Sequence, residues 1–350
     1  MTSYLFLLFI SAAALVLAAA AAAASELPWP GDQTAVTVDY KNEFPPNLSG
    51  LLYEVDKSSG QTFMYGVMNK PPTLYKLYWN NTYWVSYQKD GWTNGKQLFY
   101  PASMGVTGSP DCEDLTRGDV SADPDSVYVI SELDNNDNDN SKSRLSVLRY
   151  STSSAYTSTS LTALNEWVLT ADFPNAPINY GFEGITWISD DYLVSNNFYD
   201  ESKAKPYVPS DYPGHGSGLF FLGLEADGKI YAYALMLNGG VTSSKLLTSI
   251  KNFGASVTSL RFDSETSIMW ALCDNTCNNP NIANYAINKA TGKFEITALY
   301  DRPTGLGNYN NEGITLAPDS TCFNGKKAVF FADDDCDNGH AIRMSSTICT

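Results

Sequence analysis

The segment Glu183-Gly-Ile-Thr186 recurs as Glu312-Gly-Ile-Thr315 and, with two substitutions, as Glu113-Asp-Leu-Thr116. Leu48-Ser-Gly-Leu51 and Val257-Thr-Ser-Leu260 are weaker relatives of the same segment. The five segments are spread along the chain, with matched positions at 50, 113, 183, 258 and 313. An internal repeat of several tens of residues is typical of β-propellers, in which each repeat forms one four-stranded blade.

Each repeated segment is followed by a turn region and a second apolar run. These second runs are Thr62–Met68, Ser126–Ser131, Tyr192–Ser195, Ile268–Cys273 and Ala328–Ala332. Third and fourth runs are visible in two units, at Arg144–Tyr150 with Glu166–Thr170 and at Gly218–Leu224 with Lys229–Leu235. Runs rich in Val, Ile and aromatic residues between Gly, Asn, Asp and Ser clusters predict β-strands.

The last unit has room for only three strands before Thr350. The N-terminal run Ala35–Tyr40 is expected to supply its fourth strand and close the ring, which removes exposed sheet edges. We therefore predict an all-β protein, a β-propeller of five blades, with residues 25–350 as a single domain. Six blades are the alternative, because the units are long. A β-sandwich or two unrelated all-β domains would also produce many short strands.

The N-terminus predicts secretion. Tyr4–Ile10 and Ala12–Leu17 are apolar, and an alanine tract then extends to Ala24. Small residues at Ala22 and Ala24 suit signal peptidase, so a signal peptide over residues 1–24 is expected. A retained membrane anchor is the alternative, because the run is long enough to span a bilayer. The mature protein is expected to be extracellular, away from the membrane and monomeric.

The charge balance limits the partners. Asp and Glu number 38 against 22 Lys and Arg, which gives a net charge of −16. Nucleic acid is an unsuitable partner, because phosphate binding needs a basic surface. A cation and a small-molecule ester, phosphoester or glycan are the expected ligands.

The chain has six cysteines, which in a secreted protein indicate disulfides. Six cysteines allow 15 connectivities. The favoured one pairs Cys273 with Cys277 and Cys322 with Cys336, which are close in sequence, and Cys112 with Cys349. Zinc is a poorer interpretation, because there are only two histidines and no Cys-x-x-Cys pair. Asn47 and Asn80 begin N-glycosylation sequons.

Carboxylates and amides recur at two positions of the predicted blades. In a propeller, the start of the first strand and the end of the second lie on one face. The first position holds Glu113, Glu183 and Glu312, and the second holds Glu132, Asn196, Asp274 and Asp333. Gathered like charges repel, and a bound cation relieves that repulsion. Oxygen ligands favour Ca²⁺, with Mg²⁺ as second choice. The tract Asp134–Asp139 adds further oxygens or is a solvated loop, and the glutamates could instead bond to backbone amides.

Candidate catalytic groups are few. His340 and Arg343 follow the acidic end of a predicted strand, where His340 could transfer protons and Arg343 could hold an anion. His215 lies in a glycine-rich loop that lacks the setting of a serine-hydrolase elbow. Trp84 and Trp92 belong to an aromatic-rich unit that would serve either core packing or sugar stacking.

The Glu-Gly-Ile-Thr segments, Asp111-Cys-Glu-Asp-Leu-Thr116 and the ending from Phe330–Asp335 to Gly339–Arg343 resemble secreted propellers of the phytase-like (esterase-like activity of phytase) and SdiA-regulated type. The resemblance implies a propeller and a calcium-dependent role. Leu48–Leu51 and Val257–Leu260 depart from it, because they lack the glutamate.

Two functions follow from these features. The first is a metal-dependent hydrolase of phosphate or carboxylic esters, with Glu183 and Glu312 holding the metal and His340 or a carboxylate moving protons. The alternative is a non-enzymatic extracellular module that binds a glycan or protein.

Overall fold

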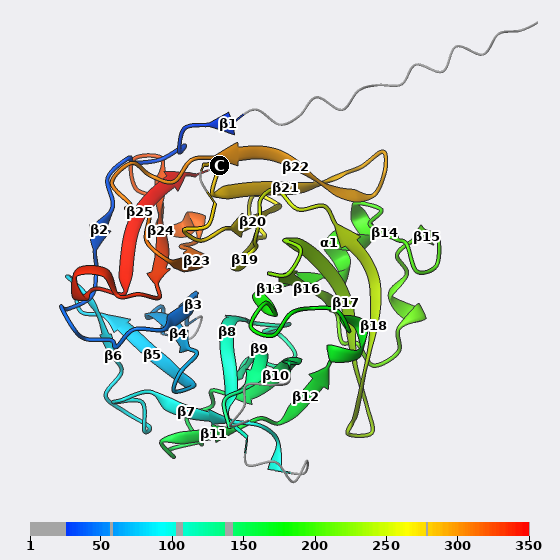
Figure 1. Cartoon of the computed structure of the whole chain (residues 1–350), viewed down its shortest axis with the longest axis horizontal. Coiled ribbons are helices and arrows are strands. Elements are labelled where there is room, and N and C mark those ends of the chain that lie inside the picture. Colours follow the sequence, from blue (N-terminus) through cyan, green and yellow to red (C-terminus); the bar gives the residue numbers. More distant parts are fainter. Residues whose placement is uncertain (1–25, 57–58, 103–107, 137–142, 278, 350) are drawn as a thin grey trace, which may run out of the picture.

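The structure is a computed structural model that describes residues 26–56, 59–102, 108–136, 143–277 and 279–349. Five mainly antiparallel sheets stand around one axis, so the predicted five-bladed β-propeller is confirmed (Figure 1). The innermost strands are β3 (Leu48–Val55), β8 (Pro110–Thr116), β13 (Phe182–Ser189), β19 (Ser259–Asp263) and β23 (Asn311–Leu316). The predicted signal peptide and the residues 137–139 of the acidic tract lie outside the described residues.

Successive strands of each blade run outward from the axis. The second strands are β4 (Thr62–Met68), β9 (Ser126–Asp134), β16 (Gly218–Leu224), β20 (Ile268–Leu272) and β24 (Lys326–Asp333). The third strands are β5 (Thr73–Trp79), β10 (Ser143–Ser151), β17 (Lys229–Asn238), β21 (Ile282–Asn288) and β25 (Ile342–Ile348). The outer strands of the first four blades are β6 (Trp84–Ser86) with β7 (Lys96–Phe99), β12 (Asn165–Val168), β18 (Val241–Ile250) and β22 (Lys293–Tyr300). The short strand β11 (Ser160–Thr162) extends the first blade by pairing with β7.

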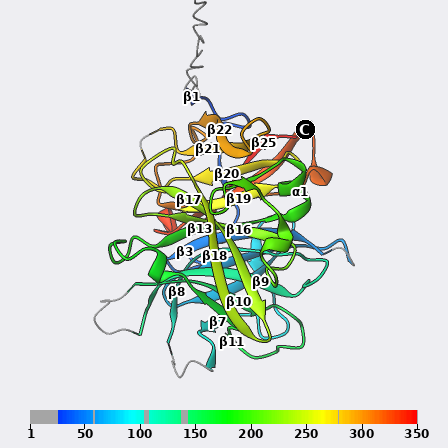
Figure 2. The ribbon, with the colours of Figure 1, turned by 90° about the vertical axis from the view of Figure 1, so that its right-hand side faces the viewer.

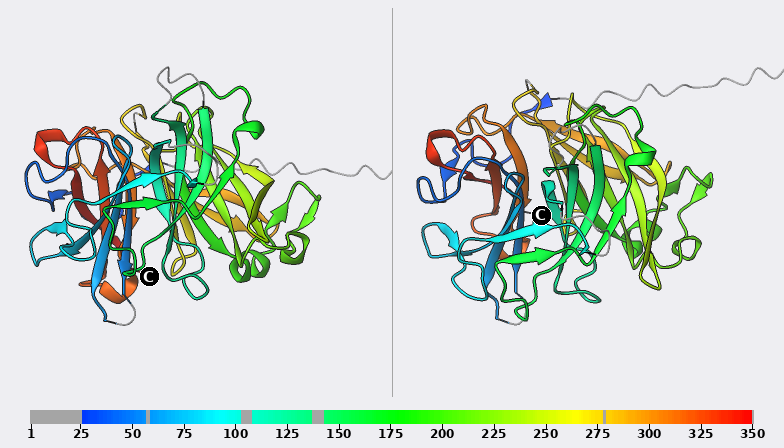
Figure 3. Two further views of the ribbon diagram at one scale, coloured as in Figure 1. Left: turned by 90° about the horizontal axis from the view of Figure 1, so that it is seen from below. Right: turned by 60° about the horizontal axis from the view of Figure 1, so that its bottom comes forward.

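The N-terminal segment closes the ring, as predicted. β2 (Val36–Thr37) pairs antiparallel with β25 and forms the outer strand of the fifth blade. β1 (Glu26–Leu27) adds itself, parallel, to β22 of the fourth blade, which the sequence did not predict. Figure 2 shows β1 beside β22 at one edge of the molecule, and both views of Figure 3 show the blue first blade against the red last one.

The predicted second strand at Tyr192–Ser195 is wrong. These residues belong to helix α1 (Asp190–Ser195). Ser189 caps it by accepting a hydrogen bond from the Tyr192 N–H, and Asp190 and Asp191 occupy its first turn, where acids are favourable. The second strand of this blade is therefore β16, after an insertion that also contains the hairpin β14 (Tyr199–Asp200) and β15 (Lys205–Pro206).

Large apolar side chains fill the space between neighbouring blades. Tyr53 of the first blade stacks on Phe330 of the fifth, and Trp84 meets the same ring edge-on. Trp84 and Trp92 are buried, so their interpretation as core residues is confirmed and they cannot stack on a sugar. None of the helices in the described ranges is long and apolar enough to cross a membrane.

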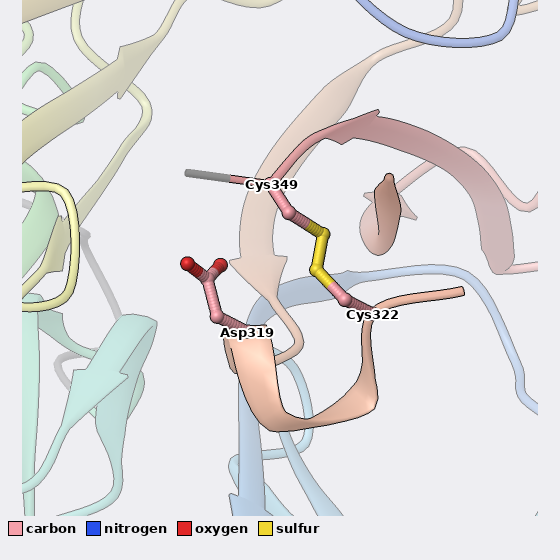
Figure 4. A group of neighbouring side chains, drawn as sticks. All are labelled: Asp319, Cys322 and Cys349. Atoms are coloured by element: carbon pink, nitrogen blue, oxygen red, sulfur yellow. A yellow bond between two sulfur atoms is a disulfide. The ribbon is translucent and has the colours of Figure 1, made fainter. Parts of the chain in front are cut away.

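One of the three predicted disulfides is confirmed. Cys273 pairs with Cys277, whereas Cys322 pairs with Cys349, and Cys112 and Cys336 are free. The reason is the register of β24 with β25, in which Lys326 lies opposite Ile348. This register brings Cys349 back to the start of the hairpin beside Cys322 (Figure 4), while Cys336 lies in the turn at the other end.

Candidate metal centre in the axial pocket

A pocket of about 330 Å³ opens at one end of the axis. Its lining is polar throughout and draws on every blade: Asn69, Asp111, Glu113, Glu132, Asn179, Glu183, Glu225, Thr258, Asp274, Asn275, Asn310 and Glu312. Among these lining residues none is Lys, Arg or His. The walls can therefore offer oxygen ligands to a cation but no positive charge to an anion.

A bulge at the start of the first strands directs side chains into this pocket. The register shifts between Phe182 and Gly184 and again between Asn311 and Gly313. Glu183 and Glu312 are the extra residues, and Glu113 lies in the irregular stretch of β8. Bulges bend a strand and re-aim single side chains, which explains how residues of an inner strand reach the axis. The equivalent positions of the other two blades hold Ser49 and Thr258.

The second strands contribute an outer ring of polar groups. In four blades the member stands two residues beyond the partner of Gly50, Gly184, Ser259 or Gly313 of the inner strand. In the second blade it is Glu132, which directly follows the partner of Cys112. The ring consists of Asn69, Glu132, Glu225, Asp274 and Asp334. Polar groups from first-strand starts and second-strand ends thus meet in all five blades, and three of the blades have a glutamate at the first position.

Two carboxylate triads in the pocket have the spacing of a metal site. Oxygens of Glu113, Glu183 and Glu312 lie within 4.8 Å of one another, and so do those of Asp111, Glu113 and Glu132. Glu113 belongs to both triads. Glu113 and Glu183 are only 3% and 8% exposed, yet their carboxylates form no hydrogen bond or ion pair within the described part of the chain. Buried charges without partners are costly, so these two groups are poised for a cation.

Burial dominates the ionisation of these acids. It raises the pKa values of Glu113, Glu183 and Glu312 well above normal, and the neighbouring carboxylates raise them further. Burial also raises the pKa of Glu132 to about 8, although the Gly181 N–H that donates to Glu132 opposes the shift. The pKa of Glu225 rises to about 7 for the same reason, aided by the charge of Asp274.

A fully buried carboxylate, Asp114, joins the inner strands of neighbouring blades next to Glu113. Asp114 occupies the position that is glycine or serine in the other blades. It accepts hydrogen bonds from the N–H groups of Leu115, Ile185 and Leu260 and from the Ser259 hydroxyl. Arg261 donates to the carbonyls of Leu51 and Leu115 nearby, with one nitrogen 3.9 Å from Asp114. Asp114 and Arg261 thus tie together the inner strands of four blades.

Several predicted site residues lie elsewhere. Asn196 ends helix α1 and donates to the Tyr192 carbonyl, because the strand expected before it does not exist. Asp333 lies one residue before the ring position and accepts a hydrogen bond from Arg343 at 3.0 Å. The next residue, Asp334, is the ring member and accepts from the Ser49 hydroxyl. Arg343 is further held by the carbonyls of His340 and Asp337, and His340 Nδ1 lies 3.3 Å from Asp39. Neither His340 nor Arg343 lines the pocket, and their catalytic role remains a prediction.

A third group, Asp319 with Cys322 and Cys349, has a spacing that would suit a metal. Figure 4 shows that the two sulfurs are joined to each other. Asp319 lies 2.8 Å from the ammonium of Lys327. A disulfide has no thiolate to offer a metal, so this group is a covalent and ionic anchor for the C-terminus.

Comparison with known proteins places the chain only at the level of fold. No family model and no curated protein matches it. Among solved structures it is similar to a glycoside hydrolase (8% identity, 92% of this chain and 93% of that one, TM-score 0.47). It is similar to an oxidoreductase described as a glucose dehydrogenase from Thermus thermophilus (11%, 89% and 99%, TM-score 0.41). It is also similar to Sqt1 of Saccharomyces cerevisiae (15%, 86% and 59%, TM-score 0.35).

These likenesses carry no argument about function, and the chain spans 59% of Sqt1. The resemblance drawn from the sequence is confirmed as far as a β-propeller and no further, because no specific family is matched.

Proposed function

We propose that the axial pocket binds a divalent cation, with Ca²⁺ preferred, on Glu113, Glu183 and Glu312. The observation that supports this most is the convergence of these carboxylates, because the two buried ones, Glu113 and Glu183, have no partner in the described part of the chain. Ca²⁺ accepts six to eight oxygen ligands in flexible geometry, which suits a ring of carboxylates with amide groups around it. Mg²⁺ requires a smaller and more regular octahedral set.

We further propose that the cation serves the hydrolysis of a carboxylic or phosphate ester. A bound Ca²⁺ would supply Lewis-acid polarisation of an ester oxygen. Glu225 lines the pocket but belongs to neither carboxylate triad, and burial raises its pKa to about 7, so it is our candidate to take up and release protons near neutral pH. It is better placed for that task than His340, which does not line the pocket.

Calcium is expected to raise the melting temperature of the wild-type protein by about 3–5 °C at a hundredfold excess over its Kd. The double variant Glu183→Gln with Glu312→Gln should show no such rise, since two of the three ligands lose their charge. Differential scanning calorimetry with and without CaCl₂ measures both. Glu43→Gln, an exposed acid away from the pocket, is the matched control and should respond as the wild type does. An unshifted wild type, or an equal shift in the double variant, would contradict the cation site.

Hydrolysis requires a separate measurement. On a panel of carboxylic and phosphate esters, activity is expected with Ca²⁺, to disappear with a chelator, and to fall at least tenfold in Glu183→Gln. If calcium stabilises the protein but no ester is cleaved, the cation site stands and hydrolysis is wrong. The result would then favour the non-enzymatic binding module.

A further inference from the structure

The sequon at Asn80 lies at the tip of an exposed hairpin. β5 ends at Trp79, β6 begins at Trp84, and the sequon residues Asn80-Asn81-Thr82 form the turn between them. Asn80 Oδ1 accepts hydrogen bonds from the N–H groups of Thr82 and Tyr83, at 3.1 and 2.9 Å. The turn therefore uses the oxygen of the Asn80 side chain. Substitution on the nitrogen Nδ2 would leave these bonds intact.

An exposed aromatic side chain, Tyr40, lies beside that nitrogen and packs against Tyr83. Tyr40 is 47% exposed and Trp79 36% exposed. The rings of Tyr40 and Tyr83 lie 4.5 Å apart, and Asn80 Nδ2 is 3.4 Å from the Tyr40 hydroxyl. These rings sit where the ring-closing segment meets the first blade, since the Trp84 N–H donates to the Val38 carbonyl. A group attached to Nδ2 would begin beside the Tyr40 hydroxyl, at the edge of the Tyr40–Tyr83 pair.

The sequon at Asn47 has a different setting. Asn47 Nδ2 donates to the Lys70 carbonyl, and its backbone bonds to Asp334 and Asn69, both members of the outer ring of polar groups. Ser49, the hydroxyl residue of this sequon, is fully buried beside Asp334. A glycan on Asn47 Nδ2 would start beside the Lys70 backbone and close to Asn69, which lines the axial pocket, so it has little room there.

We propose that Asn80 carries an N-linked glycan whose first sugar packs over Tyr40 and Tyr83, and that Asn47 stays unmodified. In the transfer, Nδ2 bonds to the anomeric carbon of a lipid diphosphate-linked oligosaccharide. The bond from that carbon to the diphosphate oxygen breaks, the lipid diphosphate leaves with the electron pair, and the amide gives up one proton. The C–H face of the sugar then covers apolar ring surface that is otherwise in water.

Site occupancy is tested on the full chain secreted from a eukaryotic cell line, by peptide mapping before and after enzymatic removal of N-glycans. The wild type and Asn47→Gln are expected to carry one glycan, and Asn80→Gln none. Asn81→Gln, which changes the neighbouring residue but keeps the sequon, is the matched control and should keep the glycan. An unmodified Asn80, or a glycan on Asn47, would overturn the proposal.

The packing of the sugar is tested by a double-mutant cycle on melting temperature. Thr82→Ala removes the sequon but keeps Asn80 and the turn bonds of its Oδ1. It is expected to lower the melting temperature by about 1–2 °C in the wild-type background, and by much less in Tyr40→Ala, where the sugar has no Tyr40 ring to pack on. An equal decrease in both backgrounds would show that the sugar does not pack on Tyr40. These readouts need no added cation, so they are independent of the proposed metal site.

Discussion

Replacing Asp114 with alanine is expected to destabilise the propeller by about 3–5 kcal/mol, the range for breaking a buried charged network. The carboxylate is fully buried and accepts from four donors on three different blades. Each buried donor left without a partner costs about 1–3 kcal/mol, and the charge of Arg261 would also lose its nearby carboxylate. The inner strands approach closely at this level: a Cβ at Gly50 would lie 2.7 Å from the Asp114 Cα. The cavity left by Asp114→Ala therefore cannot be filled by a larger residue at Gly50.

Urea unfolding of the metal-free protein measures this loss. The free energy of unfolding of Asp114→Asn should lie between those of the wild type and Asp114→Ala. The amide keeps one acceptor oxygen, but its NH₂ group then faces other hydrogen-bond donors. Asp123→Ala, which removes a partly exposed acid 3.5 Å from Arg149, is the control and should change the free energy of unfolding by less than about 1 kcal/mol. A cost below about 1 kcal/mol for Asp114→Ala would refute its role as the link between blades.

The second large effect is a loss of stability of the metal-free protein as the pH rises from about 5 to 8. The pocket carboxyls have higher pKa values in the folded protein than in the unfolded chain, so the folded state binds more protons in this window. The stability contributed by these groups is therefore greatest at pH values below their pKa in the unfolded chain. It is lost as the pH rises to their pKa in the folded protein, about 7 for Glu225 and about 8 for Glu132. Each unit of pKa shift corresponds to roughly 1.4 kcal/mol. Because water at the open mouth of the pocket screens these charges, we expect a total loss on the order of 3 kcal/mol.

Calcium should abolish this decline, because a bound cation favours the ionised carboxylates. Urea unfolding at pH 5, 6, 7 and 8, with a chelator or with Ca²⁺, tests both statements. His215 acts in the same direction: burial tends to lower its pKa, but the bond and charge of Asp190 outweigh burial and raise it. Glu132→Gln and Glu183→Gln separate the two contributions, since they should flatten the profile and leave His215 unchanged. A flat profile for the metal-free wild type would contradict the argument.

Much of the candidate site was predictable from local signals. The repeated Glu-Gly-Ile-Thr segments placed Glu113, Glu183 and Glu312 on the inner strands, and the acids after Val129 and Leu272 identified Glu132 and Asp274. Glu225 was not predicted because the apolar residues of helix α1 resemble a strand in sequence. The strand assignment of the third blade was therefore shifted by one. Asp334 was missed by one residue, since three consecutive acids hide the register. Asp111 stands two residues before Glu113 in the Asp111–Thr116 segment, but the repeat predicts only Glu113 as a ligand.

The sequence by itself determined the blades, the closing strand and the sign of the charge at the axis, because these depend on periodicity and composition within short segments. The tertiary structure alone decided which side chains lack partners, that Asp114 joins the inner strands of three blades, and that Cys349 meets Cys322. Each of these depends on backbone groups from strands far apart in the chain, and their positions follow from strand register and bulges. The repeats of the sequence contain the carboxylates. Their burial without a counter-charge depends on the packing of five blades around them.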